Sequence, residues 1–283
     1  MATVYINGKF LSKEEAMINV YDHGLLYGDG VFEGIRVYNY KVFKLKEHLD
    51  RLYDSAKCVY LNIPMDKDKM QEVVEETVRR SKYQDAYIRL VITRGVGNLG
   101  LNPIGTSPSV ICIVDGISLY PAKMYEEGMS VIISSVTRNH VNCISPRVKS
   151  LNYLNNILAK LEAINAGCSE AIMLNSQGYV AECSADNIFI CKGGIIKTPP
   201  LSAGPLAGIT RDTVIELARS NGYTLLEENL TTYDLYTADE IFLTGSAAEM
   251  IPITKIDLRV IGNGKAGPIF KDLSTKYHKF VRS

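Results

Sequence analysis

The sequence predicts an α/β protein with two domains, and three observations support this fold class. The chain has 283 residues, of which 46% are hydrophobic, enough to bury two cores of ordinary size. Segments in which apolar residues alternate, as in strands, are interspersed with segments of helical spacing. The pattern breaks at GISLYPAKM, residues 116–124. We therefore expect a smaller N-terminal α/β domain over 1–116, a linker over 117–124 and a larger C-terminal domain over 125–283.

Composition excludes several classes of protein. The 31 Lys and Arg residues equal the 31 Asp and Glu residues, so no global field favours nucleic acid or an anionic membrane as a partner. No run of about 18 apolar residues occurs, and MATVYINGKF lacks the features of a signal peptide, which favours a cytoplasmic location. The six cysteines form no CxxC pair and the four histidines lack ligand spacing. We expect neither disulfides nor a metal site.

Hairpins, two helices and two strands are predicted in the first domain. Residues 2–12 and 31–45 are typical of hairpins, and a helix is expected over 46–60. Strands are predicted at AYIRLVITR (86–94) and SVICIVD (109–115), and the Gly-rich segment between them fits neither period, which makes it a candidate lid. The second helix has its apolar face at Met70, Val73, Val74, Thr77 and Val78.

The second domain mixes strands and helices from residue 130 onward. The alternation at residues 147–149 suggests a strand end, and EAIML with YVAECSADNIFI predicts a hairpin that carries Glu182. LAGITRDTVIELARSNG predicts a helix with Thr210 as its N-cap, and FLTGSAAEM predicts a strand that ends at Gly245 and Ser246. After Lys149, a helix is expected from the spacing of Leu151, Leu154, Ile157, Leu158, Leu161 and Ile164.

Lys149, Glu182 and two glycine-bearing loops together indicate one kind of chemistry. A lysine at a strand-to-helix junction is ordinarily a solvated charge, whereas Glu182 lies on a strand built for burial and needs a positive partner. Backbone N–H groups near Thr210 and Gly245 could each hold an anion. Pyridoxal phosphate needs a lysine to bind its aldehyde, an acid to keep the pyridine nitrogen protonated, and a phosphate cup of N–H groups with a cation. With Arg51 as the cation, the chain supplies all of these groups.

On these residues, the sequence resembles the fold type IV pyridoxal-phosphate enzymes and, among them, the branched-chain amino acid aminotransferases. The resemblance covers essentially the whole chain. It is highly specific to this family, because many motifs match and all of them occur in the same order. It implies a D-amino acid aminotransferase-like fold with a pseudo-barrel in the larger C-terminal domain. The motifs are YGDGVFEGIR, HLDRLYDSA, AYIRL, GLNP, KSLNYLNN, GYVAECSADNIF, LAGITRD and TGSAAEM.

The resemblance implies which residues bind the cofactor. Lys149 would bind it covalently and be the catalytic residue, Glu182 would contact the pyridine nitrogen, and Tyr153 would contact the ring hydroxyl. Arg51 would reach the phosphate. The remaining cofactor positions are the packing residue Leu206 and the phosphate-cup residues Ile209, Thr210, Gly245 and Ser246.

The resemblance also implies the substrate site. Arg89 in AYIRL matches the arginine that receives the distal carboxylate of glutamate. The turn through Gly245, Ser246 and Ala247 would hold the α-carboxylate. The other positions are Tyr27, Phe32 and Gly34, together with Leu99 and Leu101 of the lid. Phe32 and the two leucines can also be interpreted as ordinary core residues.

The implied reaction is transamination between leucine, isoleucine or valine and 2-oxoglutarate, giving branched-chain 2-oxo acids and L-glutamate. The resemblance also implies a homodimer or an assembly of dimers. Asp29, with YGDGVFE and HLDRLY, also resembles D-amino acid aminotransferases. That activity and aminodeoxychorismate lyase remain alternatives within the fold, although Arg89 argues against the lyase. A non-catalytic ligand-binding protein is a further alternative, against which the retained Lys149 argues.

Cys183, where many relatives carry glycine, is interpreted as a small buried residue.

Overall fold

The computed structural model of the protein describes residues 3–283 and divides into two compact units. The first unit contains the chain up to Ile117 together with Val148–Asn152, and the second contains Ser118–Arg147 and Tyr153–Ser283. Each unit combines a sheet with helices, so the predicted two-domain α/β class is confirmed. Lys149 belongs to the first unit, although most of that unit precedes it by more than thirty positions in the sequence.

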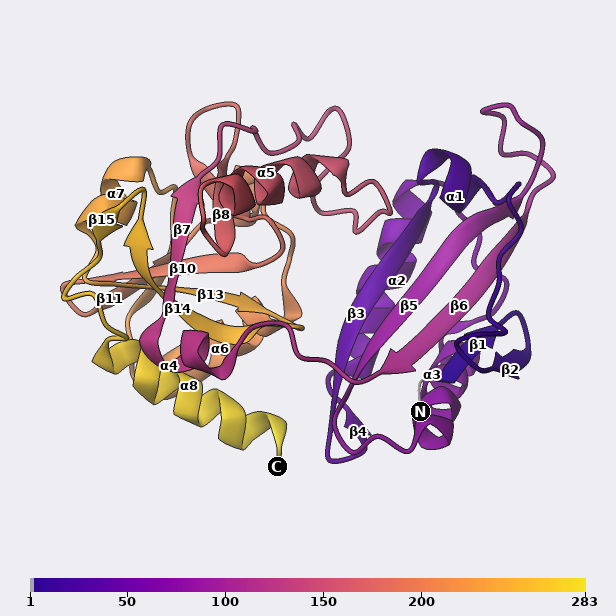
Figure 1. The fold of residues 1–283 in the computed structure, drawn as a ribbon, viewed down its shortest axis with the longest axis horizontal. Helices are drawn as coiled ribbons and strands as arrows, with labels where there is room; N and C mark the ends of the chain where they lie inside the picture. Colours follow the sequence, from indigo (N-terminus) through magenta and orange to yellow (C-terminus); the bar gives the residue numbers. More distant parts are fainter. Residues whose placement is uncertain (1–2) are drawn as a thin grey trace. The chain divides into compact units, whose positions relative to one another are not determined.

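Within the described residues, the first unit is built on a six-stranded antiparallel sheet of order β2-β1-β6-β5-β3-β4. Helices α2 and α3 cover one face of it, α2 against β3 and α3 against β1 and β6 (Figure 1). The helices are α1 (His23–Tyr27), α2 (Leu45–Cys58) and α3 (Lys67–Ser81). The strands are β1 (Thr3–Ile6), β2 (Lys9–Leu11), β3 (Gly30–Tyr38), β4 (Lys41–Val42), β5 (Ala86–Val96) and β6 (Ser107–Asp115).

Strand β3 divides its side chains between the core and the opposite face of the sheet. Val31 and Ile35 are fully buried in the core that α2 and α3 complete. Because successive strand residues point to opposite faces, Glu33 shares the core face, while Phe32 and Gly34 share the other. In the pairing of β3 with β5, Gly34 lies opposite Arg89. The predicted substrate residues of these two strands therefore lie on one face.

Within the described residues, the second unit is built on a nine-stranded sheet of order β12-β11-β10-β13-β14-β7-β8-β9, with β15 paired to β14. The sheet is curled, because the turn after its end strand β9 leads directly to β10 near the other end, and Cys183 N–H donates to Asp186 C=O at 2.7 Å. The strands are β7 (Met129–Ile133), β8 (Glu170–Leu174), β9 (Val180–Cys183), β10 (Asn187–Lys192), β11 (Ile195–Thr198), β12 (Leu225–Glu227), β13 (Glu240–Gly245), β14 (Glu249–Ile256) and β15 (Arg259–Val260).

The helices of the second unit pack on this sheet. Helix α5 packs against β8, and α6 and α8 pack against each other and β13 (Figure 1). They are α4 (Ala122–Glu127), α5 (Leu154–Asn165), α6 (Ile209–Ser220), α7 (Thr232–Thr237) and α8 (Pro268–Val281), with a 3₁₀ turn at Leu201–Ala203. In the part of the chain that the structure describes, no helix has both the length and the apolar character needed to cross a membrane.

The strand end predicted at residues 147–149 is wrong. Residues 146 and 147 form a turn, and the chain then lies along the edge of β3, joined to it by an isolated bridge between Val31 and Ser150. Pro146 has no N–H to donate to a ladder, which shortens the segment that could pair. Lys149 therefore follows a turn rather than a strand.

Helix α5 forms where the sequence predicts it, but its apolar residues are not its buried face. Leu154, Ile157 and Ile164 are 66%, 51% and 57% exposed. The buried positions are Asn156, Ala159 and Ala163. Small side chains allow the helix to lie close to β8, so the large apolar ones remain on the outer surface.

Helix α6 begins at Ile209 with Gly208 as its N-cap, so the prediction of Thr210 as N-cap is wrong. Threonine and glycine are about equally favoured at an N-cap, so the surroundings decide between them. A Cβ at position 208 would come within 1.9 Å of Asn187 Oδ1, so any other residue there would displace the Asn187 side chain. Thr210 lies in the first turn and is buried.

Gly95 allows β5 to change register against β6, which gives a test of the fold. Its φ is +83°, and a Cβ there would meet the Ser107 carbonyl oxygen at 1.7 Å. We expect Gly95→Ala to lower the free energy of unfolding by more than about 2 kcal/mol, because backbone strain and a backbone clash add. Gly8→Ala is the matched control, since Gly8 has φ +94° and open space around it. Its cost should be about 1 kcal/mol. Urea unfolding curves would measure both, and equal losses would contradict the role assigned to Ser107.

Candidate active site

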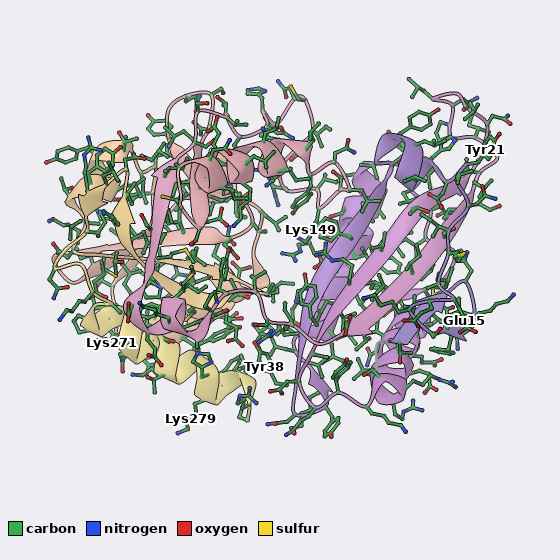
Figure 2. The ribbon with its side chains drawn as sticks, in the orientation of Figure 1. Glu15, Tyr21, Tyr38, Lys149, Lys271 and Lys279 are labelled. Carbon is green, nitrogen blue, oxygen red and sulfur yellow. The ribbon has the colours of Figure 1, made fainter. Side chains whose placement is uncertain are left out.

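Lys149 is held against β3 and α2 by its own backbone. Its carbonyl accepts from Phe32 N–H at 2.9 Å, and its N–H donates to Ser55 Oγ at 3.2 Å. Three residues later, Asn152 Nδ2 donates to the Gly28 carbonyl at 2.8 Å. The side chain lies beside β3 (Figure 2), with Nζ 4.6 Å from the centroid of the Phe32 ring. These anchors fix the backbone from which the amine extends.

Arg89 shares the Phe32 ring with Lys149. Its guanidinium carbon lies 4.6 Å from the ring centroid, and Nη2 donates to the Tyr87 hydroxyl at 3.3 Å. A Cβ on Gly34 would come within 1.9 Å of that hydroxyl. Glycine at this position therefore makes room for Tyr87, which in turn supports Arg89. The structure thus brings Lys149, Phe32, Gly34 and Arg89 together within the first unit.

Tyr27, Leu99 and Leu101 belong to a second group in the same unit. The Tyr27 ring meets the buried His23 ring edge to face, with centroids 5.0 Å apart. His23 Nε2 lies 2.8 Å from the carbonyl oxygen of Asn98, which ties α1 to the loop of the two leucines. Leu99 and Leu101 are 69% and 82% exposed. The interpretation of these leucines as core residues is therefore wrong.

Arg51 is paired with a fully buried carboxylate. Its Nε and Nη2 donate to the two oxygens of Glu33, each at 2.7 Å, and the buried His48 places Nδ1 2.8 Å from Glu33 Oε2. Burial alone would raise the pKa of Glu33, but Arg51 and His48 outweigh it and lower that pKa to about 2. Burial lowers the pKa of His48, against the opposing effect of Glu33. The cluster is therefore a carboxylate, a guanidinium and a neutral imidazole that donates through Nδ1.

Glu182 on β9 is buried, and its cation is a protein side chain. Arg138 Nε donates to Glu182 Oε1 at 2.9 Å, and both side chains are 6% exposed. Leu206 N–H donates to Oε2 at 3.0 Å. The expectation that Glu182 needs a positive partner is confirmed, and Arg138 is that partner. Arg138 and the Leu206 N–H thus each give one oxygen of the buried carboxylate a donor.

Gly208, the N-cap of α6, and Gly245, the last residue of β13, both lie against the turn that leads from β9 into β10. A Cβ on Gly208 would meet Asn187 Oδ1, and a Cβ on Gly245 would meet Asp186 Oδ1, each at 1.9 Å. Gly208 offers no side-chain cap to α6, so the N–H groups of the first turn, at Ile209 and Thr210, have no partner within the helix. Such a helix N-terminus suits an anion.

Asn187 joins this helix end to the buried acid. Its Nδ2 donates to the Leu206 carbonyl at 2.9 Å and lies 3.4 Å from Glu182 Oε2. Thr244 is paired with Asn187 across β10 and β13, so its side chain shares the face of Asn187. Its buried Oγ1 has no hydrogen-bond partner among the described residues. The predicted residues Leu206, Ile209, Thr210 and Glu182 therefore lie close together.

The remaining predicted residues of the second unit are half-buried. Ser246 and Ala247 form the turn between β13 and β14, and Tyr153 is the N-cap of α5. Cys183, next to Glu182, is fully buried, and burial raises the pKa of its thiol well above the ordinary value. It is thus an inert small residue, as the sequence suggests.

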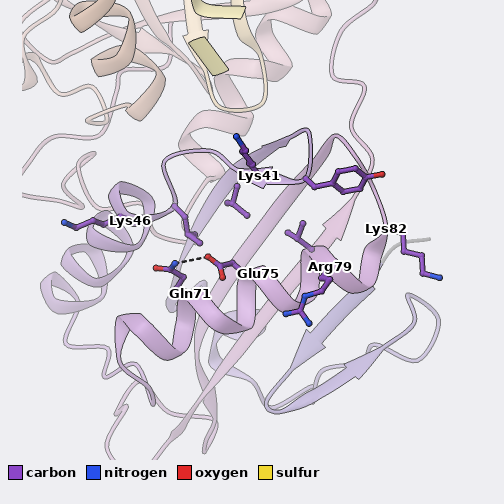
Figure 3. Close-up of a pocket in the computed structure, with 10 residues that line it drawn as sticks. Lys41, Lys46, Gln71, Glu75, Arg79 and Lys82 are labelled. Atoms are coloured by element: carbon purple, nitrogen blue, oxygen red, sulfur yellow. Dashed lines mark hydrogen bonds between the residues drawn. The ribbon is translucent and has the colours of Figure 1, made fainter. Parts of the chain in front are cut away.

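A surface hollow of about 870 Å³ in the first unit is separate from all predicted site residues. Figure 3 shows Lys41, Lys46 and Lys82 at its rim with their ammonium groups directed outward. Its one acid, Glu75, accepts from Gln71 Nε2 at 2.8 Å. Because the cations do not converge, the hollow lacks the arrangement that would bind an anion.

Sequence reasoning missed the residues that support the predicted ones: Tyr87, Glu33, His48, Arg138 and Asn187. Glu33 carried a usable signal, because in VFEGIRV it shares one face of the strand with the apolar residues Val31 and Ile35. An acid on a strand built for burial is the same signal that singled out Glu182. Arg138 carried none, because it precedes Glu182 by 44 positions in an irregular segment.

Comparisons with known proteins agree over nearly the whole chain. The model of the family "Amino-transferase class IV" matches residues 30–256. The branched-chain-amino-acid aminotransferase of Pseudomonas aeruginosa is 40% identical over 284 residues, covering 98% of this chain and 92% of its own. The solved structure of the Escherichia coli branched-chain amino acid aminotransferase is 35% identical with a TM-score of 0.96, covering 99% of this chain and 94% of that one. The branched-chain amino acid aminotransferase of T.th., complexed with N-(5'-phosphopyridoxyl)-L-glutamate, is 39% identical with a TM-score of 0.93 and the same coverage.

The lowered pKa of Glu33 predicts how stability changes with pH. A carboxylate whose pKa falls from 4.5 to about 2 on folding stabilises the fold above the unfolded value, and this stabilisation is lost as the pH falls from about 4.5 towards 2. Glu33→Gln should therefore be less stable than the wild type at neutral pH, by on the order of 3 kcal/mol at most. The difference should shrink as the pH falls below about 4.5.

Urea unfolding at a series of pH values would measure this convergence. Glu47→Gln makes the same chemical change at an exposed position of the helix that carries the partners of Glu33, and its profile should run parallel to that of the wild type. A Glu33→Gln difference that stayed constant with pH would contradict the charged, paired state of Glu33.

Proposed function

The chain belongs to the class IV aminotransferase family, and from this premise we propose that it is a pyridoxal-phosphate-dependent branched-chain aminotransferase. It transfers the amino group of leucine, isoleucine or valine to 2-oxoglutarate, giving a branched-chain 2-oxo acid and L-glutamate. The names of its relatives support the branched-chain substrates. The phosphopyridoxyl-glutamate adduct of the T.th. relative supports both the cofactor and glutamate.

Two cations beside one aromatic ring support the proposal most directly. Lys149 Nζ and the Arg89 guanidinium each lie 4.6 Å from the centroid of the same Phe32 ring. A primary amine can bind an aldehyde and move protons, and a guanidinium can bind a carboxylate through a planar fork of donors. The apolar ring beside them offers a surface to a branched hydrocarbon side chain. Together these three groups suit the transfer of an amino group between an apolar amino acid and a dicarboxylate.

The residues present fit the cofactor. The uncapped N-terminus of α6 and the hydroxyl of Thr244, unpaired among the described residues, are donors suited to a phosphate. The buried Glu182 is an acceptor suited to a protonated pyridine nitrogen. When bound, pyridoxal phosphate supplies an electron-withdrawing ring that stabilises negative charge at the substrate α-carbon. We propose that it is held by Arg51, Lys149, Tyr153, Glu182, Leu206, Ile209, Thr210, Gly245 and Ser246.

Lys149 performs the chemistry in this proposal. Its amine would hold the cofactor through the aldehyde group and, when released, would be the base that takes the proton from the substrate α-carbon. Backbone hydrogen bonds to Phe32 and Ser55 limit where that amine can reach. Glu182, which Arg138 holds in place, would accept from the protonated pyridine nitrogen.

The substrate site must accept an apolar side chain in one half-reaction and a carboxylate in the other. Phe32, with Leu99 and Leu101 of the lid and Tyr27, contributes apolar surface, and Gly34 leaves the space that Tyr87 fills. Arg89, supported by Tyr87, receives the distal carboxylate of glutamate. The turn at Gly245, Ser246 and Ala247 holds the α-carboxylate. We favour L-amino acids over the D-amino acid and lyase alternatives, because Arg89 and the apolar groups serve a dicarboxylate and a hydrocarbon in turn.

We further propose that the chain acts as a homodimer or an assembly of dimers. The exposed apolar residues of α5, among them Leu154, Ile157 and Ile164, support this, since isolated soluble surfaces seldom carry such a stripe. Sedimentation equilibrium of the purified chain measures the assembly directly. A cytoplasmic location stays a prediction from the sequence.

A panel of L- and D-amino acids with 2-oxoglutarate tests the proposed reaction. We expect L-glutamate to form with leucine, isoleucine and valine, and the D-enantiomers to give a rate lower by a factor of about 100 or more, as expected for roughly 2.7 kcal/mol of discrimination. A chiral separation of the products, with the Lys149→Ala variant as a background control, measures both. Turnover confined to D-amino acids would contradict the substrate assignment, and release of pyruvate from aminodeoxychorismate would favour the lyase.

The two half-reactions should depend differently on Arg89. Arg89→Leu removes a charge-assisted contact that only the dicarboxylate makes, worth roughly 1.5–3 kcal/mol, or a factor of about 10 to 150 in kcat/KM. We expect glutamate and 2-oxoglutarate to lose this factor, while the leucine, isoleucine and valine half-reactions stay within a few-fold of normal.

Single-turnover absorbance changes separate the two half-reactions. Arg79→Leu, at an exposed arginine of the same unit, controls for the loss of one positive charge and should change neither. Equal losses for both substrate classes in Arg89→Leu would mean that Arg89 supports the fold or the α-carboxylate instead.

A further inference from the structure

Arg51 is fixed along one edge of its guanidinium before any phosphate reaches it. Glu33 engages Nε and Nη2, each at 2.7 Å, so Nη1 is the nitrogen that Glu33 leaves to other partners. The Glu33 side chain is fully buried and that of Arg51 is 13% exposed. The charged carboxylate therefore has no alternative solvation by water, and the fork-to-fork geometry is strongly favoured.

His48 completes the coordination of Glu33. It lies on α2 one turn before Arg51, and its Nδ1 donates to the same oxygen that receives Arg51 Nη2. The imidazole is buried and its pKa is lowered by burial, so it acts as a neutral donor rather than as a second cation. Both donors come from one helix, and the acceptor comes from the core face of β3. The direction of the Arg51 side chain is thus set by two elements of secondary structure.

We propose that Glu33 and His48 are positioning residues for the cofactor phosphate, which hold the Arg51 fork so that its remaining donors face the phosphate. This inference rests on the proposed function and deepens it, since it assigns part of the phosphate affinity to two residues that do not touch the phosphate. A free arginine side chain populates many rotamers and loses that freedom on binding. Arg51 has already lost it through Glu33, so the phosphate is bound by a donor that needs no further ordering.

Charge and orientation predict opposite effects of removing Glu33. As a nearby negative charge, Glu33 repels a phosphate, so Glu33→Gln would tighten binding if charge alone mattered. As an orienting acceptor, it strengthens binding, and the variant would weaken it. The amide of glutamine has one oxygen and one NH₂ group. In one orientation the NH₂ group faces Arg51 Nε, and in the other it faces Arg51 Nη2 and His48. In either case at least one contact becomes donor to donor. Orientation dominates, because the Glu33 charge is already matched by the guanidinium in contact with it.

The test compares two ligands that differ only in the phosphate. The full-length chain is freed of cofactor and titrated with pyridoxal phosphate and with pyridoxal, and binding is followed by absorbance. For Glu33→Gln we expect the Kd of pyridoxal phosphate to rise about 10- to 100-fold and that of pyridoxal to change less than about threefold. Glu47→Gln, the same change at an exposed position of α2, should leave both values unchanged.

Variants of His48 keep the inference testable if Glu33→Gln folds poorly. His48→Leu removes the donor and should raise the Kd of pyridoxal phosphate severalfold, whereas His48→Asn, whose side-chain amide can take the place of Nδ1–H, should restore much of the affinity. An unchanged or lowered Kd for pyridoxal phosphate in both Glu33→Gln and His48→Leu would overturn the positioning role, as would equal losses for the two ligands. If the wild-type chain bound neither ligand, the proposed function itself would fail.

Discussion

A carboxylate buried in a protein core must be matched by a cation, and in this chain that constraint holds candidate site residues of both units in place. In the first unit, Glu33 fixes Arg51 and His48 against the core face of β3. In the second, Arg138 fixes Glu182 on β9. Each pair carries no net charge, so it provides directed donors and acceptors without a strong field. In the proposed function, the first pair would orient a donor for a phosphate and the second an acceptor for a pyridine nitrogen.

The alternation of β3 connects this constraint to the substrate. One strand presents Glu33 to the helices and Phe32 and Gly34 to the opposite face, where Arg89 and Tyr87 arrive from β5 in register. Lys149 then reaches the Phe32 ring because its backbone is bonded to the edge of the same strand. A slip of one residue in the β3–β5 pairing would exchange the two faces and separate all of these groups. The register of a single pair of strands therefore positions the residues of the first unit that we propose for phosphate binding and for substrate recognition.

Much of the fold and part of the site could be predicted from the sequence, because periodicity is local. The buried face of α3, at Met70, Val73, Val74, Thr77 and Val78, and the hairpin that carries Glu182 follow from spacing alone. The buried face of α5 does not, since its closeness to β8 selects alanine over leucine. The N-cap of α6 depends on space beside Asn187, and the partner of Glu182 lies 44 positions away. Glu33 could have been found by the alternation argument that identified Glu182. The resemblance to a known family supplied roles for residues, but not the side chains that hold them in position.

Lys149 is the residue on which the proposed chemistry depends, and borohydride reduction followed by peptide mapping tests its role most directly. Reduction fixes pyridoxal phosphate permanently on the lysine that holds it, and the modified peptide can then be identified by mass. We expect one modified peptide, the one that contains Lys149 in KSLNY, and no modification in the Lys149→Ala variant treated in the same way. Modification at Lys160, which is already paired with Glu170, or at any other lysine of the wild-type chain would contradict the account.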